Sequence, residues 1–137
     1  MFGPNHYSVA QTLNNLGLLY LDQHKPDQAK PFFLRALVIR EQSLGSEHPD
    51  IAQTLNDLAR LYLDQNQYTE AEPLLQRALA IREQRLGPNH PLMAESLYNL
   101  ARLYVYQSKY EQAESLSQRA LVIVKQVPGT KHPDSTM

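Results

Sequence analysis

Apolar residues recur at intervals of three and four along six segments of the chain, which is the spacing of one helical face. The first segment carries Leu13, Leu16, Leu19 and Tyr20, and the same four residue types recur twice, as Leu55, Leu58, Leu61 and Tyr62 and as Leu97, Leu100, Leu103 and Tyr104. No segment sustains the period-two alternation of a half-buried strand. The pattern predicts an all-α protein of about six helices, near residues 7–22, 27–44, 50–64, 69–86, 92–106 and 111–127.

The chain is an internal repeat with a period of 42 residues. Four glycines stand 42 residues apart and a histidine follows each of them, giving the pairs Gly3 and His6, Gly45 and His48, Gly87 and His90, and Gly129 and His132. Aligned without gaps, residues 3–44 and 45–86 are identical at 23 of 42 positions, and 45–86 and 87–128 at 21 of 42. We therefore predict one array of three units, 3–44, 45–86 and 87–128, with 129–137 as the truncated start of a fourth.

The connections between units carry helix stop and start signals. Leu-Gly-x-x-His-Pro at 44–49 and 86–91 places glycine after one helix and proline near the start of the next. Because the turn histidines occur once per unit, a stack places them in a row along one edge. This spacing favours a structural role at the turn over a metal site.

Small residues at fixed places complete a recognisable pattern. Gly17 precedes Tyr20 by three positions, Ala29 follows that tyrosine by nine, and Ala36 follows by seven more; the same register holds small residues at 59, 71 and 78 and at 101, 113 and 120. With the stretches LNNLGLLYLDQ at 13–23, AEPLLQRALAIREQRLG at 71–87 and GPNHP at 87–91, the chain resembles tetratricopeptide repeat (TPR) proteins of the 42-residue, kinesin-light-chain-like type. The resemblance implies an open right-handed superhelical stack (α-solenoid) of three helix-turn-helix units, whose first helices line a concave face.

That concave face is the candidate binding site. Residues on the first helices that lie off the apolar stripe share one face, and they are rich in amides, with two arginines and two tyrosines, which are frequent binding anchors. In kinesin light chains, Asn-rich first helices line a cargo-peptide groove, and 14–15, 56–57 and 98–99 occupy matching positions here. We expect the groove to hold a peptide segment of a partner protein, against the alternative of a merely solvated face. The predicted groove residues are Gln11, Asn14, Asn15, Leu18, Asp22, Gln53, Asn56, Asp57, Arg60, Asp64, Glu95, Tyr98, Asn99, Arg102 and Tyr106.

Mixed charge in this face leaves the sign of the ligand open, although the arginines favour acidic peptide segments. In the class of repeats that binds chaperone tails, basic residues clamp a terminal carboxylate. The matching first position reads Gln11, Gln53 and Glu95, without lysine, which does not favour that specificity.

Composition excludes several other functions. With 13 Lys plus Arg against 14 Asp plus Glu, the chain lacks the basic excess of a nucleic-acid binder, and without cysteine it has no disulfide, thiolate nucleophile or thiolate zinc site. No apolar run approaches the roughly 18 to 20 residues that cross a bilayer, and the start lacks the features of a secretory signal. No phosphate-binding loop or catalytic motif is present. We expect a cytoplasmic protein that is not an enzyme, with no cofactor, metal, nucleic acid or membrane partner.

The last predicted helix is unusually apolar for the end of an array, which normally carries a polar outer face. Val124 and Val127 stand where earlier units have arginine or serine, and Leu121 and Val122 add to the apolar surface. At the other end, Leu18 stands where the later units have arginine. Two interpretations follow: the chain is cut from a longer array, or these faces pair with another chain. The second makes self-association the alternative function, through Leu121, Val122, Val124 and Val127.

Overall fold

The computed structural model of the protein describes residues 7–126, and within that range it contains six α-helices and no strand. They are α1 (Tyr7–Asp22), α2 (Pro26–Leu44), α3 (Pro49–Asp64), α4 (Tyr68–Leu86), α5 (Pro91–Tyr106) and α6 (Tyr110–Gln126). Each begins within one residue of its predicted start, so the all-α prediction is confirmed. The predicted start of a fourth unit, 129–137, and the turn residues His6 and His132 lie outside the described residues.

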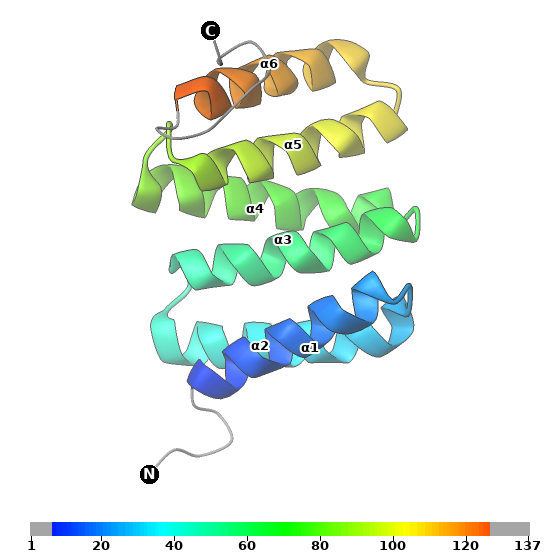
Figure 1. Cartoon of the computed structure of the whole chain (residues 1–137), viewed down its shortest axis with the longest axis vertical. Coiled ribbons are helices and arrows are strands. Elements are labelled where there is room, and N and C mark those ends of the chain that lie inside the picture. The colour runs from blue at the N-terminus through cyan, green and yellow to red at the C-terminus, as the bar shows by residue number, and fades with distance from the viewer. Residues whose placement is uncertain (1–6, 127–137) are drawn as a thin grey trace, which may run out of the picture.

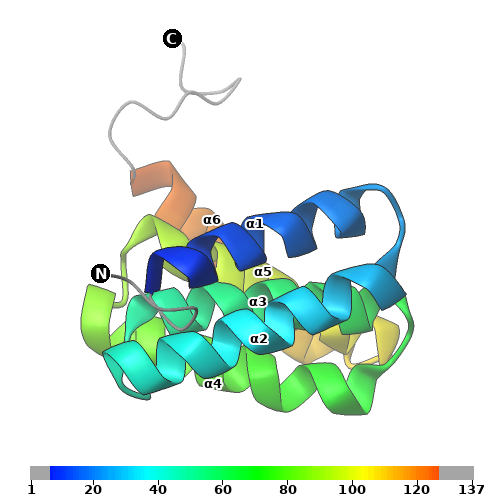
Figure 2. The same cartoon turned by 90° about the horizontal axis from the view of Figure 1, so that it is seen from below.

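The helices form three pairs stacked in chain order, as the repeat predicts. Figure 1 shows α1 and α2 at the lower end of the stack and α5 and α6 at the upper end. Seen from below, in Figure 2, the first pair lies nearest the viewer. The backbones of successive first helices (α1 with α3, and α3 with α5) approach one another closely, whereas those of α2, α4 and α6 stand farther apart and are linked by long side chains. The stack is therefore tighter on the side of the first helices, which is the side where the concave face was expected.

The turns between units carry the capping groups that end one helix and start the next. Gly45 and Gly87 have φ of 84° and 94°, in the left-handed region, and each donates its N–H to a carbonyl four residues back. The ring Nδ1 of His48 then accepts the N–H of Asp50 at 3.0 Å, and that of His90 accepts the N–H of Leu92 at 3.1 Å. The structural role expected of the turn histidines is therefore seen at both described turns.

Apolar side chains from three helices fill each interface between units. Leu61 of α3 packs into the first unit against Leu21 and Phe33, and all three are buried. One repeat later Leu103 of α5 packs in the same way against Leu63 and Leu75. Each unit also buries apolar side chains between its own two helices, as Leu13 and Ile39 show, so the stability of a helix pair combines its own packing with that of its neighbours.

Candidate functional site

The structure divides the fifteen predicted groove residues by exposure. Exposed are Gln11, Asn15, Asp22, Asp64, Glu95, Tyr98 and Tyr106; half-buried are Leu18, Gln53, Arg60 and Arg102; buried are Asn14, Asn56, Asp57 and Asn99. Three of the buried four, Asn14, Asn56 and Asp57, bond to side chains of a neighbouring unit. The remaining eleven are exposed or half-buried, and we call the surface of the first helices that carries them the accessible face.

A buried hydrogen-bond network joins the first two units. Asn14 donates its amide to Asp57 Oδ2 at 2.9 Å and accepts the hydroxyl of Thr54 at 2.8 Å. Gln53 donates to both oxygens of Asp57 at 3.2 Å. Burial raises the pKa of the Asp57 carboxyl above its ordinary value, although these two amide donors counteract the shift. Amides that the sequence assigns to a ligand are thus already bonded to the neighbouring unit.

Two fully buried arginines, which sequence reasoning did not single out, connect the units. Arg40 donates to the hydroxyl of Thr54 at 2.7 Å, to the carbonyl of Asp50 at 3.0 Å and to Gln11 Oε1 at 2.8 Å. Burial lowers its pKa, and the nearby aspartates counteract this. The only sequence signal was that arginine recurs at 40 and 82 on an otherwise buried helix face.

Arg82 repeats this arrangement at the second junction. It donates to Glu95 Oε1 at 2.9 Å, to the hydroxyl of Ser96 at 3.0 Å and to the carbonyl of Leu92 at 3.1 Å. A further bond reaches Gln53 Oε1 at 3.1 Å. Each arginine therefore fixes the start of the next first helix to the unit before it.

The two groove arginines are also paired across the junctions. Arg60 lies 2.7 Å from Asp22 Oδ1, and Arg102 lies 3.6 Å from Asp64 Oδ1. Arg102 also donates to the hydroxyl of Tyr106 at 3.3 Å. Both arginines are thus less available to an acidic ligand than the sequence suggested.

Two hollows on the accessible face are lined by residues of more than one unit. One, of about 350 Å³, is lined by Gln11, Asn14, Asn15, Leu18, Arg40, Pro49, Asp50, Gln53 and Leu92, and so draws on all three first helices. The other, of about 490 Å³, lies where the first helices end and is lined by Leu21, His24, Pro26, Leu63, Asp64, Asn66 and Tyr106. Within residues 7–126 no group of three or more acidic, histidine or cysteine side chains could hold a metal ion.

The three described residues predicted for self-association differ in exposure and position. Leu121 is half exposed at the end of the stack, where Val124 is partly buried. Val122 is exposed on the outer side, at the position that Val38 occupies in the first unit and with similar exposure. Val127 lies outside the described residues. Among these residues, Leu121 and Val124 are the two that bear on stacking.

No helix within the described part of the chain is long and apolar enough to cross a membrane. A model of the tetratricopeptide repeat family matches residues 8–84 and 64–126. No curated protein matches the chain.

Solved structures with the same architecture include BtubC (BKLC) from P. vanneervenii, with 27% identity and a TM-score of 0.82 over 94% of this chain and 51% of that one. A Podosopora anserina kinesin light chain with nearly identical TPR-like repeats has 27% identity and a TM-score of 0.81, over 94% of this chain and 61% of that one. The TPR domain of Arabidopsis FLU shares the fold at 19% identity, with a TM-score of 0.74 over 86% of this chain and 96% of that one. The chain thus spans about half of the first structure and 61% of the second.

Proposed function

The chain belongs to the tetratricopeptide repeat family, and we propose that it holds a peptide segment of a partner protein against the accessible face of its first helices. The fold is that of a protein–protein interaction scaffold of the kinesin-light-chain-like type. Members of the family are typically scaffolds without enzymatic activity, and we propose the same for this chain. Its cytoplasmic location stays a prediction from the sequence.

The observation that carries the peptide proposal is the hollow of about 350 Å³ shared by the three first helices. Gln11 and Asn15 of α1 lie at its wall with exposed side chains, and Gln53 of α3 is half-buried beside them. Leu18 and Leu92 supply apolar surface. A few polar groups converging on a partly apolar hollow is the usual composition of a binding site, and amide side chains can bond the backbone of an extended peptide.

The expected ligand chemistry is mixed. A carboxylate that approached Arg60 or Arg102 would have to displace the aspartate that each already contacts. We therefore propose a peptide that bonds through its backbone to the exposed amides of Gln11 and Asn15, which bond each other at 3.0 Å without it, and places an apolar side chain near Leu18, with charge as a secondary feature.

The test is selection of unstructured peptides on the purified chain, followed by affinity measurements with variants. Gln11→Ala combined with Asn15→Ala should weaken the selected peptides about tenfold, which corresponds to about 1.4 kcal/mol. Gln118→Ala, at an exposed position of α6, serves as the matched control and should leave the affinity unchanged. Equal affinity of the groove variant and the wild-type chain would contradict the proposal.

Exchanging the charges of Asp22 and Arg60 tests whether Arg60 contacts the peptide or only supports the stack. Asp22→Arg combined with Arg60→Asp keeps a cation and an anion at the junction but moves the cation by one unit. If Arg60 contacts the peptide, affinity falls in the exchanged variant; if the pair only supports the stack, Arg60→Asp alone weakens binding and the exchange restores it.

A second function, self-association through the ends of the stack, is favoured by one specific observation. Leu61 and Leu103 are fully buried, yet Leu19, at the same position of the first unit, is 52% exposed. Sedimentation of the purified chain tests this proposal, and a monomer of 15.7 kDa at all concentrations would remove it.

A further inference from the structure

The two junctions inside the chain define how a first helix seats on the pair of helices before it. At both, a leucine of the incoming helix enters the gap between the two preceding helices, Leu61 between α1 and α2 and Leu103 between α3 and α4. The two leucines stand 42 residues apart in the sequence and make equivalent contacts at the two junctions. These junctions are therefore an internal template for any further one.

The lower end of the stack is a first helix that no described residue covers. Thr54 and Ser96 are completely buried, whereas Thr12, at the same position of α1, is exposed. Leu19 is exposed for the same reason. This face of α1 has the shape and residue pattern that α3 and α5 bury.

The upper end of the stack, formed by α5 and α6, is the surface on which a further first helix would pack, and we call it the seat. Val105 is 47% exposed where Leu21 and Leu63 are buried, and Tyr98 is 59% exposed at the position of a buried asparagine. Between α5 and α6 lies a hollow of about 280 Å³, lined by Tyr98, Ala101, Arg102, Val105, Tyr106 and Ser117. Ser117 replaces the bulky Phe33 and Leu75 of the other units, which leaves room for an incoming side chain.

We propose that the occupant of this seat is α1 of a second copy of the chain, so that copies join head to tail with Leu19 of one entering the hollow of the next. The inference rests on the self-association proposed above and adds its partner, register and symmetry. Head-to-tail contacts between identical chains do not close on themselves unless a rotation completes a ring, so the assembly grows as an open row.

The two ends of the stack carry matching side chains at the positions where each internal junction has an ion pair. Inside the chain, Arg60 meets Asp22 and Arg102 meets Asp64. The corresponding residues at the ends are Leu18 below and Tyr106 above. Both halves of the pair have changed to uncharged groups, so the proposed junction sets the leucine against the tyrosine ring and introduces no unpaired charge at this position.

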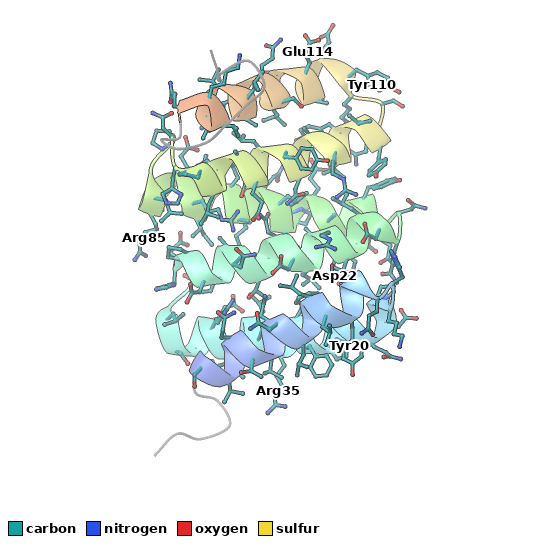
Figure 3. All side chains as sticks on the ribbon, in the orientation of Figure 1. Tyr20, Asp22, Arg35, Arg85, Tyr110 and Glu114 are labelled. Atoms are coloured by element: carbon teal, nitrogen blue, oxygen red, sulfur yellow. The ribbon has the colours of Figure 1, made fainter. Side chains whose placement is uncertain are left out.

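Two further positions agree with this register. Tyr104 donates its hydroxyl to Glu72 across an internal junction at 3.5 Å, and the corresponding pair at the ends is Tyr20 with Glu114. Figure 3 shows Tyr20 at the lower end of the stack and Glu114 at the upper end. Val124 stands where a buried arginine bonds the next helix, so this junction need not desolvate a guanidinium.

At one position the proposed junction brings two like charges together, and this position supplies a sensitive test. Arg77 pairs with Glu41 at 2.9 Å and Arg119 with Glu83 at 3.5 Å across the internal junctions. At the ends, Arg35 would face Lys125. Because both side chains are exposed, the repulsion is modest and is screened by salt.

The first experiment is sedimentation velocity of the purified chain, without peptide, up to about 100 µM, where contacts with Kd in the micromolar range are visible. The expected result is an average mass that keeps rising with concentration and passes two copies. A constant 15.7 kDa overturns self-association and the register together. A plateau at two copies indicates a closed two-fold contact and overturns the head-to-tail register alone.

The second experiment tests the register with complementary variants. Leu18→Arg and Tyr106→Asp each place a charge against an apolar group, so each alone should need about tenfold higher concentration to associate. An equimolar mixture brings the introduced arginine of one variant against the introduced aspartate of the other, which restores association. Failure of the mixture to recover overturns the register. Both positions are partly exposed, and a circular dichroism melt verifies that each variant folds.

Lys125→Glu should tighten association at low salt, because it recreates the Glu41 and Arg77 pair with Arg35. Lys25→Glu, the same charge change at the turn between α1 and α2, is the control and should have no effect. Equal effects of both variants would mean that net charge, rather than this contact, controls association. Since no peptide takes part in these experiments, their outcome is independent of the peptide-binding proposal.

Discussion

Gly17 of α1 lies directly against the ring of Phe33 of α2. A β-carbon on residue 17 would stand 2.6 Å from Phe33 Cε1, well inside van der Waals contact. The later units place alanine at this position and a smaller residue opposite it, Leu75 in the second unit. The size of one residue is therefore matched to that of the other in each helix pair.

Gly17→Ala should destabilise the chain by about 1 kcal/mol, because overpacking against a fully buried ring outweighs the higher helix propensity of alanine. Adding Phe33→Leu recreates the combination of the second unit and should recover most of that loss. Urea unfolding of the two single variants and the double variant gives the coupling energy. A stabilised Gly17→Ala variant would show that the ring can move aside.

Arg82→Ala should lower the free energy of unfolding by about 3 kcal/mol, since it leaves Ser96, Gln53 and the Leu92 carbonyl without their donor. Arg82→Met fills most of the volume and separates lost packing from lost hydrogen bonds. Arg119→Ala, which breaks only an exposed ion pair, is the control and should cost at most about 0.5 kcal/mol. Equal losses for Arg82→Ala and Arg119→Ala would contradict the proposed role of the buried guanidinium.

His90→Ala should cost about 1 kcal/mol, because the N–H of Leu92 loses its acceptor at the start of α5. His90→Asn should cost much less, since asparagine is a good residue at this position and offers an oxygen to the same N–H. Thermal unfolding of the two variants distinguishes capping from ring packing: if packing is what matters, the two losses are alike.

The pH dependence of stability should change in Asp57→Asn. Because burial raises the pKa of Asp57 in the folded chain, the folded state holds this proton more tightly than the unfolded state. That contribution to stability is present at low pH and is lost as pH rises through the folded pKa. The variant should therefore be more stable than the wild-type chain at pH 7, with a difference that shrinks towards about pH 4, the ordinary aspartate range.

Asn99 occupies the same position in the third unit, so the substitution fits the repeat. Asp27→Asn, at an exposed carboxylate of α2, is the control and should show no such gain at neutral pH. A lower stability of Asp57→Asn at every pH would mean that the ionised carboxylate is worth more as an acceptor than its burial costs.

Local signals were enough to predict the helices and their turns. Gly45 and Gly87 adopt the left-handed backbone expected of glycine after a helix, and Pro49 and Pro91 begin the next helices. His48 and His90 each accept a hydrogen bond from the backbone N–H two residues further along the chain. Such features depend on neighbours in the sequence, so they can be inferred without a fold.

The accessible face was predicted less completely. The sequence places Asn14 and Asn15 together on a polar face, but Asn14 is buried against the second unit and Asn15 is exposed. Adjacent helix positions differ by about 100° in direction, and only the angle at which units stack decides which of the two points into the junction. For the same reason the sequence could not separate Leu121, at the end of the stack, from Val122, on its outer side.

By itself, the sequence determined the helices, their turns, the period of 42 residues and the family, because repetition and local backbone preference depend only on the order of the residues. Only the tertiary structure decided which polar side chains are buried between units and which stay exposed on the surface. Arg40 and Arg82 show the reason. In a sequence, a charged residue suggests a surface position. In the fold, hydrogen-bond partners from two other helices compensate for the burial of each of these arginines.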